Sequence, residues 1–197
     1  MTRYVRRFSI TERVIHWVNA TFFLALLATG ATLYLPSLEV AVGRRALIQE
    51  IHFWTGIGWI CALVAIAVLG DTRGLAHTAR EVDRFDRDDL RWLTGRRAPQ
   101  GRFNAGQKIN TVLTAAFTAL FLASGLLLWF GERDTRLRFA STVILHDGLA
   151  FGALALLVGH LYLAVIHPTT RHALRGMTVG TVSEDWATRH HAKWEPE

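Results

Sequence analysis

Cysteine is nearly absent from this chain of 197 residues, which has Cys61 alone. A single cysteine cannot close a disulfide within the chain. It also cannot supply the several thiolates that an iron–sulfur cluster or a structural zinc site needs. Cysteine-ligated clusters are therefore excluded within this chain, and we expect Cys61 to be a small packing residue.

Charged side chains are nearly absent from four long stretches, the last of which is interrupted only by Asp147, although 19% of the whole chain is charged. Each stretch reaches the roughly 20 residues that a membrane-spanning helix needs. The first run is too long for a cleaved signal peptide, so we expect it to be retained. We predict an all-α membrane protein with a single domain over residues 1–197, built as a four-transmembrane-helix bundle. Its parts are helices at about residues 14–36, 50–70, 108–131 and 142–167, a loop at 71–107 and a tail at 168–197.

Basic residues divide unevenly between the loops. Seventeen of the 22 Lys and Arg residues lie before the first helix, in or next to the 71–107 loop, and in the tail. Four crossings place these regions on one side, and the positive-inside rule makes that side, with both termini, cytoplasmic. Such residues set topology and contact lipid headgroups, so we expect no nucleic-acid partner. The mixed-charge run DRFDRDDLRWL predicts a short surface helix in the loop.

Two histidines stand fourteen residues apart on the last apolar stretch. On one helix, His146 and His160 would differ by only about 40° in direction and would lie about 21 Å apart along the axis. The predicted topology places His52 near the outer side with His146, and His16 near the cytoplasmic side with His160. The histidines therefore form two pairs of matching depth.

Two neutral imidazoles saturate a haem iron and suit it to electron transfer. A single histidine at a membrane boundary is usually only interfacial, so the joint pattern carries the prediction. It predicts two b-type haems, one held by His52 and His146 and one by His16 and His160. We expect His167, before Pro168, to end its helix. Four histidines are expected to be solvated: His77, His172, His190 and His191.

Glycines are frequent in the apolar stretches. They would let helices or a haem approach closely, although ordinary packing of small residues between helices explains them equally well. They are Gly30, Gly56, Gly58, Gly125, Gly148, Gly152 and Gly159.

The chain resembles the cytochrome b (gamma) subunit of respiratory, membrane-bound formate dehydrogenases. The resemblance rests on RFSITERVIHW near the N-terminus, GRFNAGQKIN, HDGLAFGALALLVGHLYLA, and the tail RHALRGMTVGTVSEDWATRHHAKW. It implies haem ligation by the same four histidines. It also implies a quinone pocket beside His160, lined by Asn104, Gly106 and Gln107. Amide groups suit a quinone carbonyl, whereas the residues alone favour an ordinary helix start with Asn104 as its N-cap.

The resemblance also implies a role and partners. Electrons would pass from an outer iron–sulfur beta subunit through two haems to quinone near the cytoplasmic side, in the bacterial inner membrane. Formate would be oxidised on a molybdenum or tungsten alpha subunit. Phe53 and Asp147 depart from the family pattern and weaken the choice of formate. The alternatives are the cytochrome b of a nickel–iron hydrogenase or thiosulfate-type reductase, and a non-redox membrane anchor or transporter.

Overall fold

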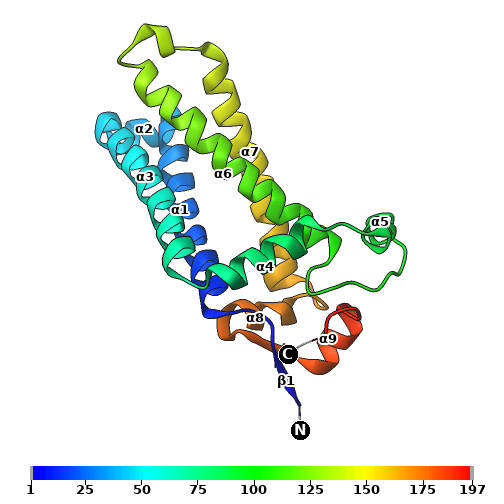
Figure 1. Cartoon of the computed structure of the whole chain (residues 1–197). Helices are drawn as coiled ribbons and strands as arrows, with labels where there is room; N and C mark the ends of the chain where they lie inside the picture. Colours follow the sequence, from blue (N-terminus) through cyan, green and yellow to red (C-terminus); the bar gives the residue numbers. More distant parts are fainter. Residues whose placement is uncertain (1, 196–197) are drawn as a thin grey trace. The chain divides into compact units, whose positions relative to one another are not determined.

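Four long helices dominate the computed structural model, which describes residues 2–195 (Figure 1). They are α1 (Ile10–Tyr34), α3 (Arg45–Leu69), α6 (Ala105–Gly131) and α7 (Ala140–Leu161), and α7 continues into a π-helix, η2 (Tyr162–Ile166). All four are long and apolar enough to cross a membrane. The predicted four-helix membrane fold is confirmed, and only residues 196–197 of the predicted tail lie outside the described part.

Three of these helices, α1, α3 and α6, begin earlier than their apolar stretches, and in α1 and α6 polar capping residues form the first turn. At the start of α1, the Ser9 N–H donates to Glu12 Oε2 at 2.7 Å and the Glu12 N–H donates to Ser9 Oγ at 3.2 Å. This reciprocal pair satisfies two backbone N–H groups that a helix start leaves unpaired. A search for apolar runs misses such a turn, so the predicted starts at residues 14 and 108 are late.

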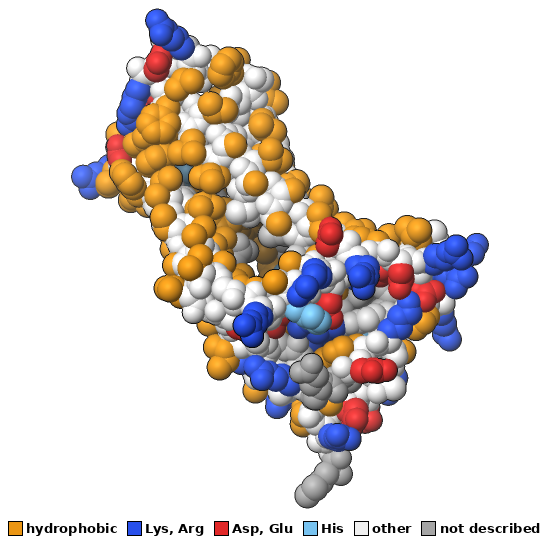
Figure 2. Space-filling model, viewed as in Figure 1, with side chains coloured by type: hydrophobic (Ala, Val, Ile, Leu, Met, Phe, Trp, Pro, Cys, Tyr) orange, Lys and Arg blue, Asp and Glu red, His pale blue; other side chains and the backbone are white. Residues whose placement is uncertain are grey.

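The spanning helices carry their apolar side chains outward. At most 11% of the most apolar window of any of them is buried, and Leu24, Val64 and Ile144 are all more than half exposed. Figure 2 shows apolar side chains along the long helices, with few charged side chains among them. Such surfaces suit contact with lipid. Cys61 is also exposed, so the expectation that it packs inside the protein is wrong.

Short elements connect the long helices. These are α2 (Pro36–Val42), α4 (Thr72–Asp83), α5 (Arg87–Leu93) and the 3₁₀ turn η1 (Thr135–Leu137). Helix α5 confirms the predicted surface helix, and its N-cap Asp86 accepts from the Asp88 and Asp89 N–H groups. Helix α4 was not predicted, although Asp71 caps it by accepting from the Gly74 N–H at 2.9 Å.

The tail folds back on the N-terminus. After the turn η3 (Arg171–Ala173) and α8 (Leu174–Val179), strand β2 (Thr181–Ser183) pairs antiparallel with β1 (Tyr4–Arg6), and α9 (Glu184–His190) follows. Gly180, with φ of 90°, makes the turn into β2. Val5, Val182 and Trp186 form a small buried cluster. This small sheet was not predicted, because three-residue strands are too short to show alternation in the sequence.

The chain divides into two compact units. The helical unit comprises Val14–Gly70 and Phe117–Gly152, and the terminal unit comprises the segment up to Arg13, Asp71–Ala116 and the chain from Ala153 onward. Within the helical unit, Trp59 of α3 is buried and its Nε1–H donates to Asn19 Oδ1 of α1 at 3.1 Å. The terminal unit gathers the three basic regions, as an even number of membrane crossings requires.

Candidate functional site

Two of the predicted ligands meet in the helical unit. His52 of α3 and His146 of α7 have ring centres 6.3 Å apart, and the ring planes are inclined by 71°. In a complex with two imidazoles on opposite sides of one metal ion, a metal–nitrogen bond of about 2 Å and a ring radius of about 1.1 Å place the ring centres about 6.3 Å apart. The separation therefore fits a pair of axial ligands.

A hydroxyl group holds each of these imidazoles by Nδ1. Thr29 Oγ1 lies 2.8 Å from His52 Nδ1, and Ser124 Oγ lies 2.8 Å from His146 Nδ1. Each hydroxyl also donates its proton to the carbonyl four residues earlier in its own helix, at 2.9 Å for Thr29 and 2.7 Å for Ser124. Because a hydroxyl has only one proton, it must accept from the Nδ1–H. This fixes the neutral tautomer with a free lone pair on Nε2, which is the form that binds a metal.

A glycine follows each of these hydroxyl residues and faces the imidazole. A Cβ added to Gly30 would lie 3.4 Å from His52 Cε1, and one added to Gly125 would lie 3.7 Å from His146 Cε1. A larger side chain at either position would therefore press on a ligand ring. The sequence analysis named both glycines but missed Thr29 and Ser124. The repeated hydroxyl–glycine dipeptide on the two helices without a ligand of this pair is the signal that could have found them.

The donor set thus fits a haem at His52 and His146. Each ring has its Nδ1 bonded to a hydroxyl, which leaves Nε2 for a metal ion. A glycine lies beside each ring. An iron with two imidazole ligands exchanges electrons and has no open position for oxygen.

The second predicted pair is divided between the two units. His16 lies on α1 in the helical unit, half-buried, with its ring centre 5.1 Å from that of Trp17. His160 lies in the last turn of α7, in the terminal unit, directly before the π-helix η2. The pairing of His16 with His160 stays a prediction. The continuous helix from Ala140 to Leu161 does contain both His146 and His160, as their spacing required.

His167 ends the π-helix. Its backbone is extended, with ψ of 124°, and its N–H donates to Tyr162 O at 2.9 Å, which spans five residues. This agrees with the expectation that His167 terminates the helix before Pro168. Single π turns are frequent at functional sites, and this one begins two residues after His160.

The predicted quinone residues form the start of α6. Asn104 Oδ1 accepts from the Gln107 N–H at 2.9 Å, and Gln107 Oε1 accepts from the Asn104 N–H at 3.1 Å. The N-cap role that the residues alone favour is therefore real. It uses the two amide oxygens, and the two amide NH₂ groups make no hydrogen bond within residues 2–195. A Cβ on Gly106 would lie 3.2 Å from the Trp92 ring, so this position needs glycine to keep that ring in place.

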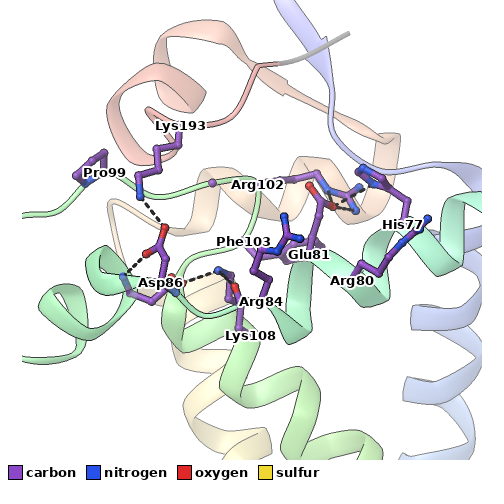
Figure 3. A pocket seen from close by; sticks show the side chains of 12 residues that line it. His77, Arg80, Glu81, Arg84, Asp86, Pro99, Arg102, Phe103, Lys108 and Lys193 are labelled. Atoms are coloured by element: carbon purple, nitrogen blue, oxygen red, sulfur yellow. Dashed lines mark hydrogen bonds and ion pairs between the residues drawn. The ribbon is translucent and has the colours of Figure 1, made fainter.

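A charged cavity of about 360 Å³ lies in the terminal unit beside this helix start (Figure 3). Ion pairs compensate much of its charge: Arg102 pairs with Glu12 at 2.9 Å and with Glu81 at 2.6 Å, and Lys108 pairs with Asp89 at 2.7 Å. Lys193 of the tail donates to Asp86, which lowers the pKa of that carboxyl to about 2. The tail therefore contributes Lys193 to the wall of a cavity that is otherwise lined by the loop and the start of α6.

The prediction that His191 is solvated is wrong, because its side chain is only 2% exposed. Its Nδ1 lies 2.6 Å from Gly101 O, and its Nε2 lies 3.2 Å from Nη2 of Arg7. Burial, with the nearby Arg7 charge, lowers the pKa of His191 to about 3. The expectation of a solvated tail failed because the HH..W run lies against the loop. His77 and His172 are exposed, as expected, and His190 is half-buried.

Comparisons with known proteins agree with this geometry. Residues 7–180 match the family described as prokaryotic cytochrome b561. The formate dehydrogenase cytochrome b556 subunit of Haemophilus influenzae is 25% identical over 213 residues, covering 100% of this chain and 84% of the relative. Two Escherichia coli K12 proteins are similar over 92% of their own length. The formate dehydrogenase cytochrome b556(fdo) subunit is 26% identical, covering 97% of this chain, and the nitrate-inducible b556(Fdn) subunit is 22% identical, covering all of it.

The resemblance read from the sequence motifs is confirmed, since the family match spans nearly the whole chain. The four apolar helices and these relatives agree on a multi-pass protein of the bacterial inner membrane. The chain therefore belongs to the prokaryotic cytochrome b561 family of b-type haem proteins.

Proposed function

We propose that this chain is the cytochrome b subunit of a membrane-bound formate dehydrogenase. In this role it carries electrons from an iron–sulfur subunit on the outer side to a quinone near the cytoplasmic side. The observation that carries the proposal is the His52–His146 pair, with ring centres 6.3 Å apart and each Nδ1 held by a hydroxyl. The choice of formate rests on the names of the similar proteins from two organisms.

Four histidines would hold two haems b, with His52 and His146 at the outer site and His16 and His160 at the inner site. Such a group supplies reversible one-electron transfer when bound. The chain itself would keep each imidazole neutral and in the orientation in which Nε2 can bind the iron. At the outer site Thr29 and Ser124 do this by accepting the Nδ1–H, as outer-shell partners of metal-bound histidines commonly do.

The quinone would bind at the start of α6, next to His160. The amide NH₂ groups of Asn104 and Gln107 are free to donate to a quinone carbonyl, because the amide oxygens already accept from backbone N–H groups. Gly106 would contribute by leaving room for the Trp92 ring at this helix start. Reduction there would take protons from the cytoplasm, and moving each electron inward would cost about 2.3 kcal/mol per 100 mV of membrane potential.

The partners would be an iron–sulfur beta subunit and a catalytic molybdenum or tungsten alpha subunit. Formate oxidation would take place on the alpha subunit, because this chain has only Cys61 to offer a cluster. Both termini would be cytoplasmic, as the excess of basic residues in the terminal unit favours.

The test uses bacterial membranes that contain the whole complex. Formate should reduce a b-type spectrum with two haems per chain, and His52→Ala should remove one haem and block formate-driven quinone reduction. His77→Ala, at an exposed loop histidine, is the matched control and should change neither. Survival of quinone reduction in His52→Ala would contradict the ligand assignment. Reduction by hydrogen or a sulfur donor, and not by formate, would overturn the choice of substrate.

A further inference from the structure

Arg7 is a buried cation without a carboxylate partner. Its residue is 3% exposed, and among residues 2–195 no Asp or Glu pairs with it. Its buried Nε makes no hydrogen bond in that part of the chain. Burying a charge without a counter-ion costs free energy, and the neighbouring Arg102 has its own acids in Glu12 and Glu81. The placement of Arg7 therefore calls for a reason other than stability.

The guanidinium of Arg7 reaches the proposed quinone site. Its Nη2 carries two protons and lies 2.8 Å from Arg102 O, 3.2 Å from His191 Nε2 and 3.3 Å from Gln107 Oε1, so one of its N–H groups is shared between two of these acceptors. A guanidinium can only donate, so it selects the oxygen end of the Gln107 amide. The Asn104 N–H selects the same oxygen. The two donors together prevent the amide from turning over, and they leave its NH₂ group as the free donor.

His191 in turn holds Arg7 from the tail. Because Gly101 O can only accept, the 2.6 Å contact requires the proton on His191 Nδ1. Nε2 then has a lone pair that accepts from Arg7 Nη2 at 3.2 Å. Trp186 lies beside both side chains, with its ring centre 5.0 Å from that of His191 and 5.1 Å from the Arg7 guanidinium carbon. The backbone also joins Arg7 to the tail, since the Arg7 N–H donates to Gly180 O at 2.8 Å.

We propose that Arg7 is a positioning residue of the quinone site, and that the C-terminal tail holds it there through His191. The chain His191–Arg7–Gln107 sets which end of the Gln107 amide faces the quinone. This inference rests on the proposed quinone site at Asn104 and Gln107. It gives the tail a part in quinone binding, although Arg7 and His191 themselves do not touch the ligand.

The experiment measures quinone reduction in membranes that contain the whole complex with a short-chain quinone as the acceptor. Arg7→Lys keeps the charge but cannot reach Gln107 and His191 together. We expect it to raise the KM for quinone about tenfold, which is the loss of one hydrogen bond to a charged group. Donor-driven reduction of both haems should be unchanged. Arg6→Lys, at the exposed neighbour, and His172→Asn, at an exposed tail histidine, are the matched controls and should leave KM unchanged.

A double variant separates positioning from general damage. If Arg7 acts through Gln107, Arg7→Lys should add almost nothing in a Gln107→Ala background, whereas independent effects multiply. If the effects on KM multiply in the double variant, or if Arg7→Lys leaves KM unchanged, the inference about Arg7 is wrong while the proposed quinone site stands. Should Gln107→Ala itself leave KM unchanged, the proposed quinone site fails and the inference with it. If Arg7→Lys does not assemble, His191→Asn decides by the same comparison, and a normal KM in that variant counts against the inference.

Discussion

His52 and His146 in the helical unit and His191 in the terminal unit are all packed among other side chains, but they use their two ring nitrogens differently. In each of the first two, Nδ1 is bonded to a hydroxyl, which leaves Nε2 for another partner, and the two ring centres lie 6.3 Å apart. His191 engages both nitrogens, one with Gly101 O and one with Arg7. A ring with one nitrogen left for a metal and a second imidazole nearby is suited to a metal site, whereas a histidine with both nitrogens bonded joins two segments of the chain.

The largest expected effect is on haem content, which should differ between a ligand histidine and a structural histidine. His146→Ala should remove one of two haems per chain, because the outer iron would lose an axial ligand. His191→Ala should keep both haems, although it removes a buried side chain and leaves the Gly101 carbonyl without its donor. Haem per chain, measured by extraction from purified protein, checks both variants. Equal loss of haem in the two would mean that the use of the ring nitrogens does not separate ligands from structural histidines.

Lowering the pH should reduce the stability of the folded protein, because His191 is buried in its neutral form. Its pKa is about 3 in the folded chain and 6.5 in the reference state. Below pH 6.5 the unfolded chain takes up a proton that the folded chain refuses, so stability is full above pH 6.5 and falls as the pH drops toward 3. Between pH 6.5 and 5 the loss should be about 2 kcal/mol, at about 1.4 kcal/mol per pH unit.

Thermal unfolding of the detergent-solubilised protein at pH 7 and pH 5 measures this loss. The window lies above the range in which Asp86 titrates, because the pKa of that carboxyl is lowered to about 2. His191→Asn should reduce the pH dependence, and His172→Asn, at an exposed position, should not. An unchanged slope in His191→Asn would assign the effect to other groups.

The two regions also differ in how far the sequence predicted them. The helical unit follows from long apolar stretches, and the depth of each histidine follows from helix length, so His52 and His146 were paired without a structure. The terminal unit depends on contacts between residues far apart in the sequence, such as Arg7 with His191. Nothing local to either residue shows those contacts. His191 was therefore placed in solvent, and the three-residue strands β1 and β2 were missed.

Residues behind the ligands were missed for a further reason. Thr29 and Ser124 lie on helices that carry no ligand of the outer pair, so their role appears only when the helices are packed. A hydroxyl in a spanning helix ordinarily bonds its own backbone, and both residues also do that. The sequence alone therefore gave them no special weight.

The smallest expected effect is on the reduction potential of the outer haem, when the hydroxyls of Thr29 and Ser124 are removed. Thr29→Ala and Ser124→Ala each leave an Nδ1–H without its acceptor, and loss of such an outer-shell partner typically costs about 10- to 100-fold in metal affinity or activity. Thr32→Ala is the matched control, because Thr32 lies on the same helix and donates to Ala28 O at 2.9 Å with no histidine beside it. We expect retained haem with a shifted reduction potential in Thr29→Ala and Ser124→Ala, and an unchanged potential in Thr32→Ala. Redox titration of the outer haem measures this shift. Identical potentials in all three variants would show that the hydroxyls serve only their own helices, and that the open Nε2 does not depend on them.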